Sequence, residues 1–122
     1  MSYKTYSEIY PQRMSSMTKN PKNWGPSLWH YLHTVAVNYP NNPSYSDIEK
    51  MVTWLDTLFI TIPCEVCRDH YKTYIEDNKL RLFQICSSGN NLFNFLVDLH
   101  NWVNIQSGKR SWSYEEAREY YK

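Results

Sequence analysis

The chain has 122 residues, with 13 Lys and Arg against 12 Asp and Glu, which gives a formal net charge of +1. This length fits one hydrophobic core and excludes a second folded domain. The balanced charge argues against nucleic acid as a partner, and no apolar run approaches the roughly 20 residues that a membrane span needs. Residues 1–17 lack the apolar core of a secretory signal. We therefore expect neither a nucleic-acid nor a membrane partner.

The beginning of the chain differs from the rest in its pattern. Residues 1–23 contain Pro11, Pro21 and no sustained apolar period, which predicts a flexible arm. The folded domain is predicted to span residues 24–122.

The first half of this domain shows two helical patterns. An apolar stripe from Leu28 to Tyr39 predicts a helix over residues 24–39, ended by Pro40. The sequence Ser46-Asp47-Ile48-Glu49 matches a capping box, and the stripe that follows it predicts a second helix up to Ile62.

The second half continues in the same way. Pro63 suits the first position of a third helix, which would place Cys64 in the first turn and end near residue 77. Residues 78–90 break the period, residues 91–106 restore it, and Ser113-Tyr114-Glu115-Glu116 is a second capping box that predicts a short fifth helix to Tyr121. Because no segment alternates as a strand does, the predicted fold is all-α, a four-helix bundle with a short fifth helix.

The sequence Cys64-Glu65-Val66-Cys67 is the strongest chemical motif. A helix N-terminus favours a thiolate, and the spacing allows the two sulfurs to form a disulfide. Such a small loop restricts the unfolded chain little, so we interpret the pair as redox-active rather than structural.

Two alternative roles for the cysteine pair are also compatible with the residue pattern. Cys64, Cys67 and His70, with Cys86 or His100 as a fourth ligand, could form a zinc site. The two cysteines could also be small buried residues. A thioredoxin-like fold is disfavoured because the chain lacks a βαβ pattern.

Thiol oxidation releases two electrons, which side chains alone cannot pass to oxygen, so a redox role requires a cofactor. A flavin needs an aromatic slot between helices. Two predicted helices offer suitable side chains, namely Trp24, Trp29 and His33 on one and His100, Asn101 and Asn104 on the other. With only three glycines in the chain, a Rossmann-type phosphate loop is excluded.

Taken together and in order, these motifs resemble the flavin-dependent sulfhydryl oxidases of the Erv/ALR type. The resemblance rests on WGPSLWHYLHT (residues 24–34), Tyr39-Pro40, PCEVC (63–67), LHNWVN (99–104) and Gly108-Lys109. It implies FAD bound within the helical bundle and a homodimer. The short form also resembles versions carried by large cytoplasmic DNA viruses, which predicts the host cytoplasm or the virion as its location, ahead of the mitochondrial intermembrane space.

The resemblance assigns roles to individual residues. It makes Cys64 the cysteine that exchanges with substrate and Cys67 the one beside the flavin. It assigns cofactor contacts to Gly25, Trp29, His33, Tyr39, His100, Asn101, Val103, Asn104 and Lys109, with Trp112 and Tyr121 as weaker matches. The implied activity oxidises protein thiols to disulfides and reduces molecular oxygen to hydrogen peroxide.

Three departures from the family pattern affect these expectations. Pro26 stands where many relatives have arginine, and Cys86 lacks its usual partner near Val97. Residues 1–23 contain no cysteine, so substrate thiols must reach Cys64 directly or through a separate thioredoxin-like shuttle. The alternatives to the oxidase are a zinc-stabilised helical interaction module that uses the cysteine pair and a redox-inactive dimer adaptor.

Overall fold

The computed structural model describes residues 20–122, and within this range every regular element is a helix. This confirms the all-α prediction. Four longer helices and one short one correspond to the predicted five; they are α2 (Pro21–Asn38), α3 (Tyr45–Thr57), α4 (Glu65–Asp77), α6 (Gly89–Gln106) and α7 (Tyr114–Tyr121). Most of the predicted arm, residues 1–23, lies outside the described residues.

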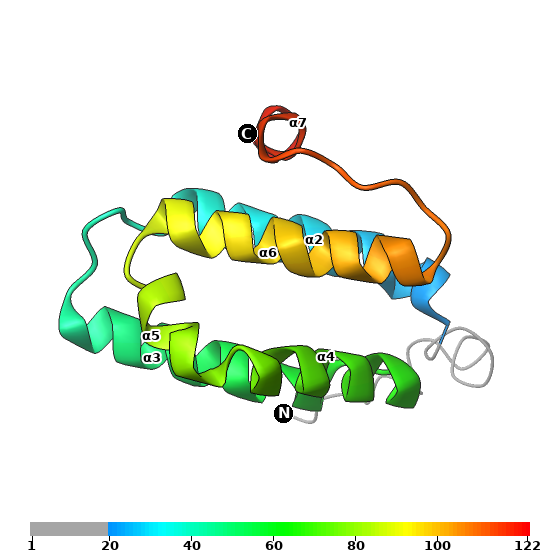
Figure 1. Cartoon of the computed structure of the whole chain (residues 1–122), viewed down its shortest axis with the longest axis horizontal. Coiled ribbons are helices and arrows are strands. Elements are labelled where there is room, and N and C mark those ends of the chain that lie inside the picture. The colour runs from blue at the N-terminus through cyan, green and yellow to red at the C-terminus, as the bar shows by residue number, and fades with distance from the viewer. Residues whose placement is uncertain (1–19) are drawn as a thin grey trace, which may run out of the picture.

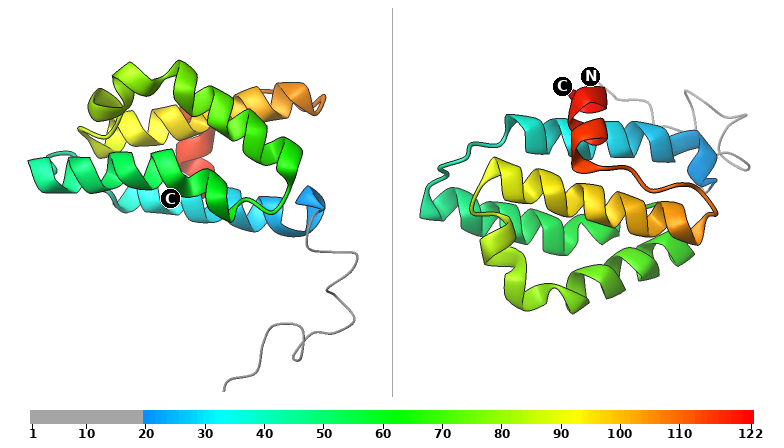
Figure 2. Two further views of the ribbon diagram at one scale, coloured as in Figure 1. Left: turned by 90° about the horizontal axis from the view of Figure 1, so that it is seen from below. Right: turned by 45° about the horizontal axis from the view of Figure 1, so that its top comes forward.

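The layers of the bundle are visible in Figure 1. Helices α2 and α6 lie side by side and form the most extensive helix–helix contact. Helices α3 and α4 cover one face of this pair, whereas α7 crosses the opposite face (Figures 1 and 2). Large apolar side chains fill the centre, among them Leu32, Leu55, Leu92, Phe93 and Leu96. None of the helices over residues 20–122 is both long enough and apolar enough to cross a bilayer.

The ends of the first two helices differ from the predictions. Helix α2 begins at Pro21, capped by the Asn20 side chain, three residues before the expected start. The cap of α3 is Ser44 and not Ser46, so the predicted box was wrong by two residues. The Asp47 carboxylate accepts from the Ser44 N–H at 3.3 Å, while the Ser44 hydroxyl accepts from the Asp47 N–H at 3.1 Å. An aspartate here takes the position that glutamate or glutamine usually holds in such a box.

Three short elements were not predicted. Helix α3 ends at Thr57 and continues as a 3₁₀ turn, η2 (Leu58–Thr61), rather than as regular helix to Ile62. Between α4 and α6 the chain forms the turn η3 (Lys79–Arg81) and the one-turn helix α5 (Leu82–Ile85), where irregular structure was expected. One helical turn is too short to show a period.

The two central helices are joined at one end by a close backbone approach. The Gly89 N–H donates to the Pro40 carbonyl at 2.9 Å, and a Cβ at position 89 would lie 2.2 Å from the Tyr39 carbonyl oxygen. Only glycine fits here without a backbone shift. At the other end of α6, Gly108 has φ of 73°, the left-handed conformation that ends many helices and here turns the chain towards α7.

Candidate active site

The site begins with the two motif cysteines at the start of α4. Cys64 is the N-cap residue, one position before the helical turn in which it was predicted. Its sulfur accepts a hydrogen bond from the Cys67 N–H at 3.3 Å, which takes the place of the oxygen of an ordinary cap. Both cysteines are half-buried and free. The motif therefore holds its first sulfur over the exposed amides of the helix.

The two thiols have different acidities. Burial raises the pKa of Cys64, but hydrogen bonds from Cys67 and from the Val66 amide, together with the charge of Arg68, outweigh it and leave the pKa below its ordinary value. Burial, followed by the hydrogen bond and charge of the neighbouring Cys64, raises the pKa of Cys67 to about 11. Cys64 is thus the better thiolate and the better leaving group of the pair.

An apolar cavity of about 290 Å³ lies between α2, α4 and α6. Leu28, Leu32 and Val103 contribute apolar wall, and Cys67 also lines the cavity, whereas Cys64 does not. The pair therefore spans from the protein surface to an internal space. A mostly apolar cavity with a few polar groups is typical of sites for aromatic cofactors.

The space at Gly25 shows whether a flat ring would fit this cavity. Its Cα is buried in the cavity wall, yet a Cβ built there would meet no atom within 4 Å. A side chain at this position would project into the open space. The wall at Gly25 is therefore left free for a ligand, and this fits a planar cofactor such as a flavin.

Four aromatic rings form a continuous row from the cavity to α7. Trp29, which lines the cavity, stacks on His100 with a centroid distance of 4.0 Å and an interplanar angle of 8°. His33 Nε2 lies 3.1 Å from His100 Nδ1, and Tyr121 stacks on His33 at 4.2 Å. His33 is fully buried, and its Nδ1 has no hydrogen-bond partner within residues 20–122.

The histidine pair is uncharged at neutral pH. Burial, with smaller effects of His100 and His30, lowers the pKa of His33 to about 3. Burial and the nearby Lys109 lower the pKa of His100 to about 4. Because both rings are neutral, one of them donates the shared hydrogen bond and the other accepts it.

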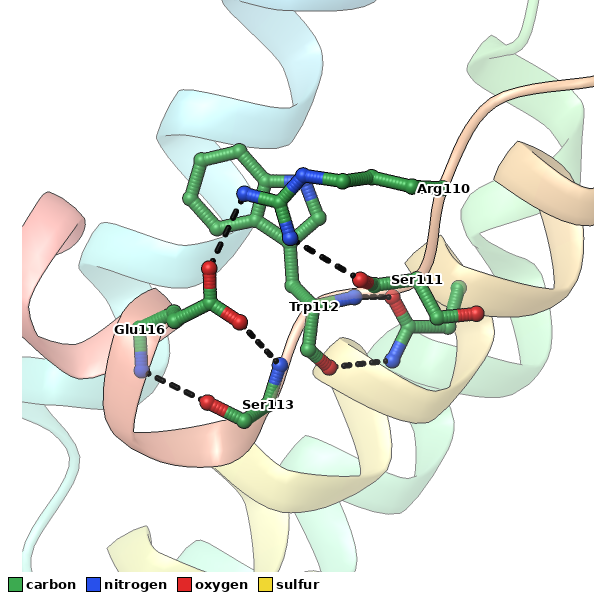
Figure 3. A network of polar contacts seen from close by, with 6 residues as sticks. Arg110, Ser111, Trp112, Ser113 and Glu116 are labelled. Atoms are coloured by element: carbon green, nitrogen blue, oxygen red, sulfur yellow. Dashed lines mark hydrogen bonds and ion pairs between the residues drawn. The ribbon is translucent and has the colours of Figure 1, made fainter.

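A network of polar contacts holds the segment before α7 in place (Figure 3). The Asn101 side chain accepts from the Trp112 N–H and donates to the Trp112 carbonyl, both at 2.8 Å. Arg110 bonds Glu116 at 2.9 Å, and Ser113 and Glu116 form the predicted capping box. The space left among His33, His100, Asn101, Trp112 and Tyr121 is about 10 Å³, the size of a single water at most.

The structure distributes the predicted cofactor residues unevenly. Gly25, Trp29 and Val103 line the cavity with Cys67, and His33, His100 and Asn101 adjoin it beneath α7. Asn104 is buried in α6, where its carbonyl accepts from the Lys109 N–H at 2.7 Å. Tyr39 lies elsewhere, and its hydroxyl donates to the Cys86 carbonyl at 2.7 Å. The Lys109 side chain is exposed but lies near enough to His100 for its charge to lower the pKa of that ring.

Some cavity residues were not assigned from the sequence. Trp24 and His70 both line the cavity. Trp24 was named as one of the aromatic side chains suitable for a flavin slot but not among the assigned cofactor contacts, and His70 was named only as a candidate zinc ligand. The spacing of His70, one turn after Cys67, could have placed it on the cavity side.

A metal site is not formed by these residues. Over residues 20–122, no three His, Cys, Asp or Glu side chains are grouped so that they could hold a metal ion. Cys86 is fully buried in the hydrophobic core. The structure therefore does not assemble the zinc ligands that the spacing left open.

The fold is an all-helical bundle, and its cysteine pair adjoins an apolar cavity large enough for a ring. These two features define the class of protein, a small redox domain. Residues 26–122 match the family model of the Erv1 / Alr family, and the chain belongs to that family.

Individual relatives agree with this assignment. The chain is 36% identical over 101 residues to a protein of Acanthamoeba polyphaga mimivirus named "probable FAD-linked sulfhydryl oxidase", covering 82% of this chain and 69% of that one. It is 26% identical over 100 residues to the FAD-linked sulfhydryl oxidase of African swine fever virus, covering 82% and 81%. The crystal structure of the FAD-binding domain of Erv1 from Saccharomyces cerevisiae superposes with a TM-score of 0.72 at 26% identity, covering 80% of this chain and 90% of that one.

Proposed function

We propose that the protein is an FAD-linked sulfhydryl oxidase, which converts two thiols of a protein substrate into a disulfide and reduces oxygen to hydrogen peroxide. The observation that carries the proposal is the division of the cysteine pair, with Cys67 in the wall of the apolar cavity and Cys64 outside it. The names of the viral relatives support the same activity.

The exchange with substrate follows from the two thiol environments. A substrate thiolate attacks the Cys64 sulfur of a Cys64–Cys67 disulfide, so the bond between the two cysteines breaks and Cys67 leaves and takes up a proton. A second substrate thiolate then attacks the substrate sulfur of the mixed disulfide, and Cys64 leaves as a thiolate. Two electrons have passed from the substrate to the pair. The lowered pKa of Cys64 favours this second step.

FAD would supply the two-electron acceptor that returns the pair to the disulfide and passes electrons to oxygen. Gly25, Trp29 and Val103 would hold its ring system, because they line the cavity together with Cys67. The apolar walls keep water from the ring, and the neutral histidine pair adds no charge beside it. The remaining contacts that we propose are His33, Tyr39, His100, Asn101, Asn104 and Lys109.

The biological setting belongs to the same proposal. Protein thiols are the substrates, reaching Cys64 directly or through a separate thioredoxin-like shuttle. We also propose a homodimer in which residues 24–122 form the catalytic domain behind an arm of residues 1–23. The viral relatives support the host cytoplasm or the virion as the location.

The test is a visible spectrum followed by turnover of a small dithiol. We expect a yellow protein that consumes oxygen and releases peroxide, and Cys64→Ser should lower turnover at least a thousandfold while the flavin stays bound. Cys86→Ala is the matched control and should keep most of the activity, since Cys86 lies in the core. A colourless, chelator-sensitive protein would support the zinc module instead, and a yellow protein without turnover the redox-inactive adaptor.

A further inference from the structure

Trp24 has a buried donor without an acceptor. It lies in the second turn of α2, and its ring forms part of the wall of the 290 Å³ cavity. The indole Nε1 is shielded from solvent and has no hydrogen-bond partner within residues 20–122. Buried N–H groups without a partner are rare in native proteins, and a ligand-binding role is one physical reason for them.

The surroundings of Trp24 offer the indole little choice of acceptor. Most of the side chains that line the cavity together with Trp24 are apolar, including Leu28, Leu58 and Val103. Gln106, Ser107 and His70 are polar and line the same cavity, yet none of them accepts from Nε1. An acceptor brought in by a ligand would satisfy this donor, and the apolar walls would strengthen the bond by excluding competing water.

We propose that the Trp24 Nε1–H donates a hydrogen bond to an acceptor atom, a carbonyl oxygen or a ring nitrogen, of the flavin ring system bound in this cavity. The inference rests on the proposed function. Trp24 is then a positioning residue: its single directional bond fixes how the ring sits relative to Cys67, which lines the same cavity. The apolar walls alone would favour burial of the ring without selecting its orientation.

The bond makes opposite predictions for the flavin-free and the flavin-bound protein. Trp24→Phe keeps an aromatic ring but removes the N–H, so the flavin-free protein loses an unsatisfied buried donor and its melting temperature should not fall. The flavin-bound protein loses a hydrogen bond. We expect the flavin dissociation constant to rise about threefold to tenfold, measured by fluorescence quenching when FAD is added to the flavin-depleted full-length chain.

The matched control is Trp54→Phe. Trp54 lies on α3, outside this cavity, and contacts Tyr31 edge-to-face with a centroid distance of 6.5 Å. The control makes the same chemical change, and flavin affinity should stay as in the wild type. A second readout is the flavin absorption maximum, which should shift in Trp24→Phe and not in Trp54→Phe.

Phenylalanine is also smaller than tryptophan, so a second variant separates shape from hydrogen bonding. Incorporation of the benzothiophene isostere of tryptophan at position 24 keeps the shape and removes only the N–H. Weaker flavin binding and a shifted spectrum in this variant would support the proposal. Flavin affinity and spectrum equal to the wild type would overturn it, even if Trp24→Phe were impaired. Failure of the wild-type chain to take up any flavin would overturn the proposed function and this inference together.

Discussion

The two faces of the α2–α6 pair are built in opposite ways. The face towards α4 encloses a cavity of about 290 Å³, with bare space at Gly25 and an unpaired donor on Trp24. The face towards α7 leaves only about 10 Å³, and the Asn101 side chain satisfies both backbone groups of Trp112. The α2–α6 pair thus has an open face, towards α4, and a closed face, towards α7.

In the flavin-free chain the first face leaves room for a ring, whereas the second is held together by stacked rings and paired amides. Space and unpaired polar groups cost free energy in the flavin-free protein, and a ligand recovers that cost when it binds. Stacked rings and paired amides stabilise the chain without a ligand. Substitutions on the two faces should therefore have effects of opposite sign.

The largest expected change in the free energy of unfolding comes from a substitution on the face towards α7. Asn101→Ala removes two hydrogen bonds of 2.8 Å and leaves backbone groups of Trp112 without their partner. We expect the free energy of unfolding to fall by about 2 kcal/mol. Urea denaturation measures it.

Gly25→Ala is the paired change on the open face. It removes a glycine from a helix, and the new methyl group meets no atom within 4 Å. The flavin-free protein should gain about 0.5–1 kcal/mol, while flavin binding weakens about tenfold because the methyl group enters the ring site. If Asn101→Ala and Gly25→Ala shifted the unfolding free energy in the same direction, the contrast between the faces would be wrong.

A smaller loss of stability should appear as the pH is lowered. Burial holds the pKa of His33 at about 3 and of His100 at about 4, below their ordinary value of 6.5. Between pH 6.5 and pH 4 the unfolded chain binds more protons than the folded chain, so the free energy of unfolding falls as the pH falls. We expect a loss on the order of 1 kcal/mol for each imidazole between pH 7 and pH 5.

Urea denaturation of the wild type and of His33→Gln at pH 5, 6 and 7 measures this loss. The variant should be less stable at pH 7 but should depend less on pH. An equally steep pH dependence in His33→Gln would mean that the closed face does not hold His33 neutral.

The smallest effect concerns the exposed end of the site. The charge of Arg68 helps to hold the pKa of Cys64 below its ordinary value, after the hydrogen bonds from Cys67 and Val66. Arg68→Gln should raise that pKa and slow alkylation of Cys64 a few-fold at neutral pH, and added salt should shrink the difference. Mass spectrometry after iodoacetamide treatment separates Cys64 from Cys67.

The control for Arg68 is Lys72→Gln, which removes the same charge from the same helix. The Lys72 ammonium lies over the Phe59 ring at 5.0 Å and does not contribute to the lowered pKa of Cys64. If both substitutions slowed the alkylation of Cys64 equally, the effect of Arg68 would come from the net charge of the protein and not from its position beside Cys64.

The sequence was informative about the helices and less so about their ends. Apolar periods located α2, α3 and α6, because their buried stripes run over several turns, whereas α4 was placed from Pro63 at its start. The box at Ser113 was found in place, whereas that of α3 begins at Ser44, because an aspartate closes it in place of the expected glutamate. The one-turn helix α5 has no period to detect.

For the candidate site, too, the sequence indicated some features and could not indicate others. The motifs identified Cys64, Cys67 and the helices around them. They could not distinguish the two faces of α6, because a cavity depends on how side chains from several elements pack. Trp24 and Trp29 look alike in sequence; only the folded chain shows that the Trp24 Nε1 lacks an acceptor.

One consequence follows from Cys64 serving as the cap of α4. Its sulfur accepts the Cys67 amide, and a thiolate accepts that bond more strongly than a disulfide sulfur. The first turn of the helix is therefore held most firmly when the pair is reduced and loosens each time the sulfur bonds to another. Catalysis and local order are coupled through one atom, so amide hydrogen exchange at Cys67 should report the redox state of the motif.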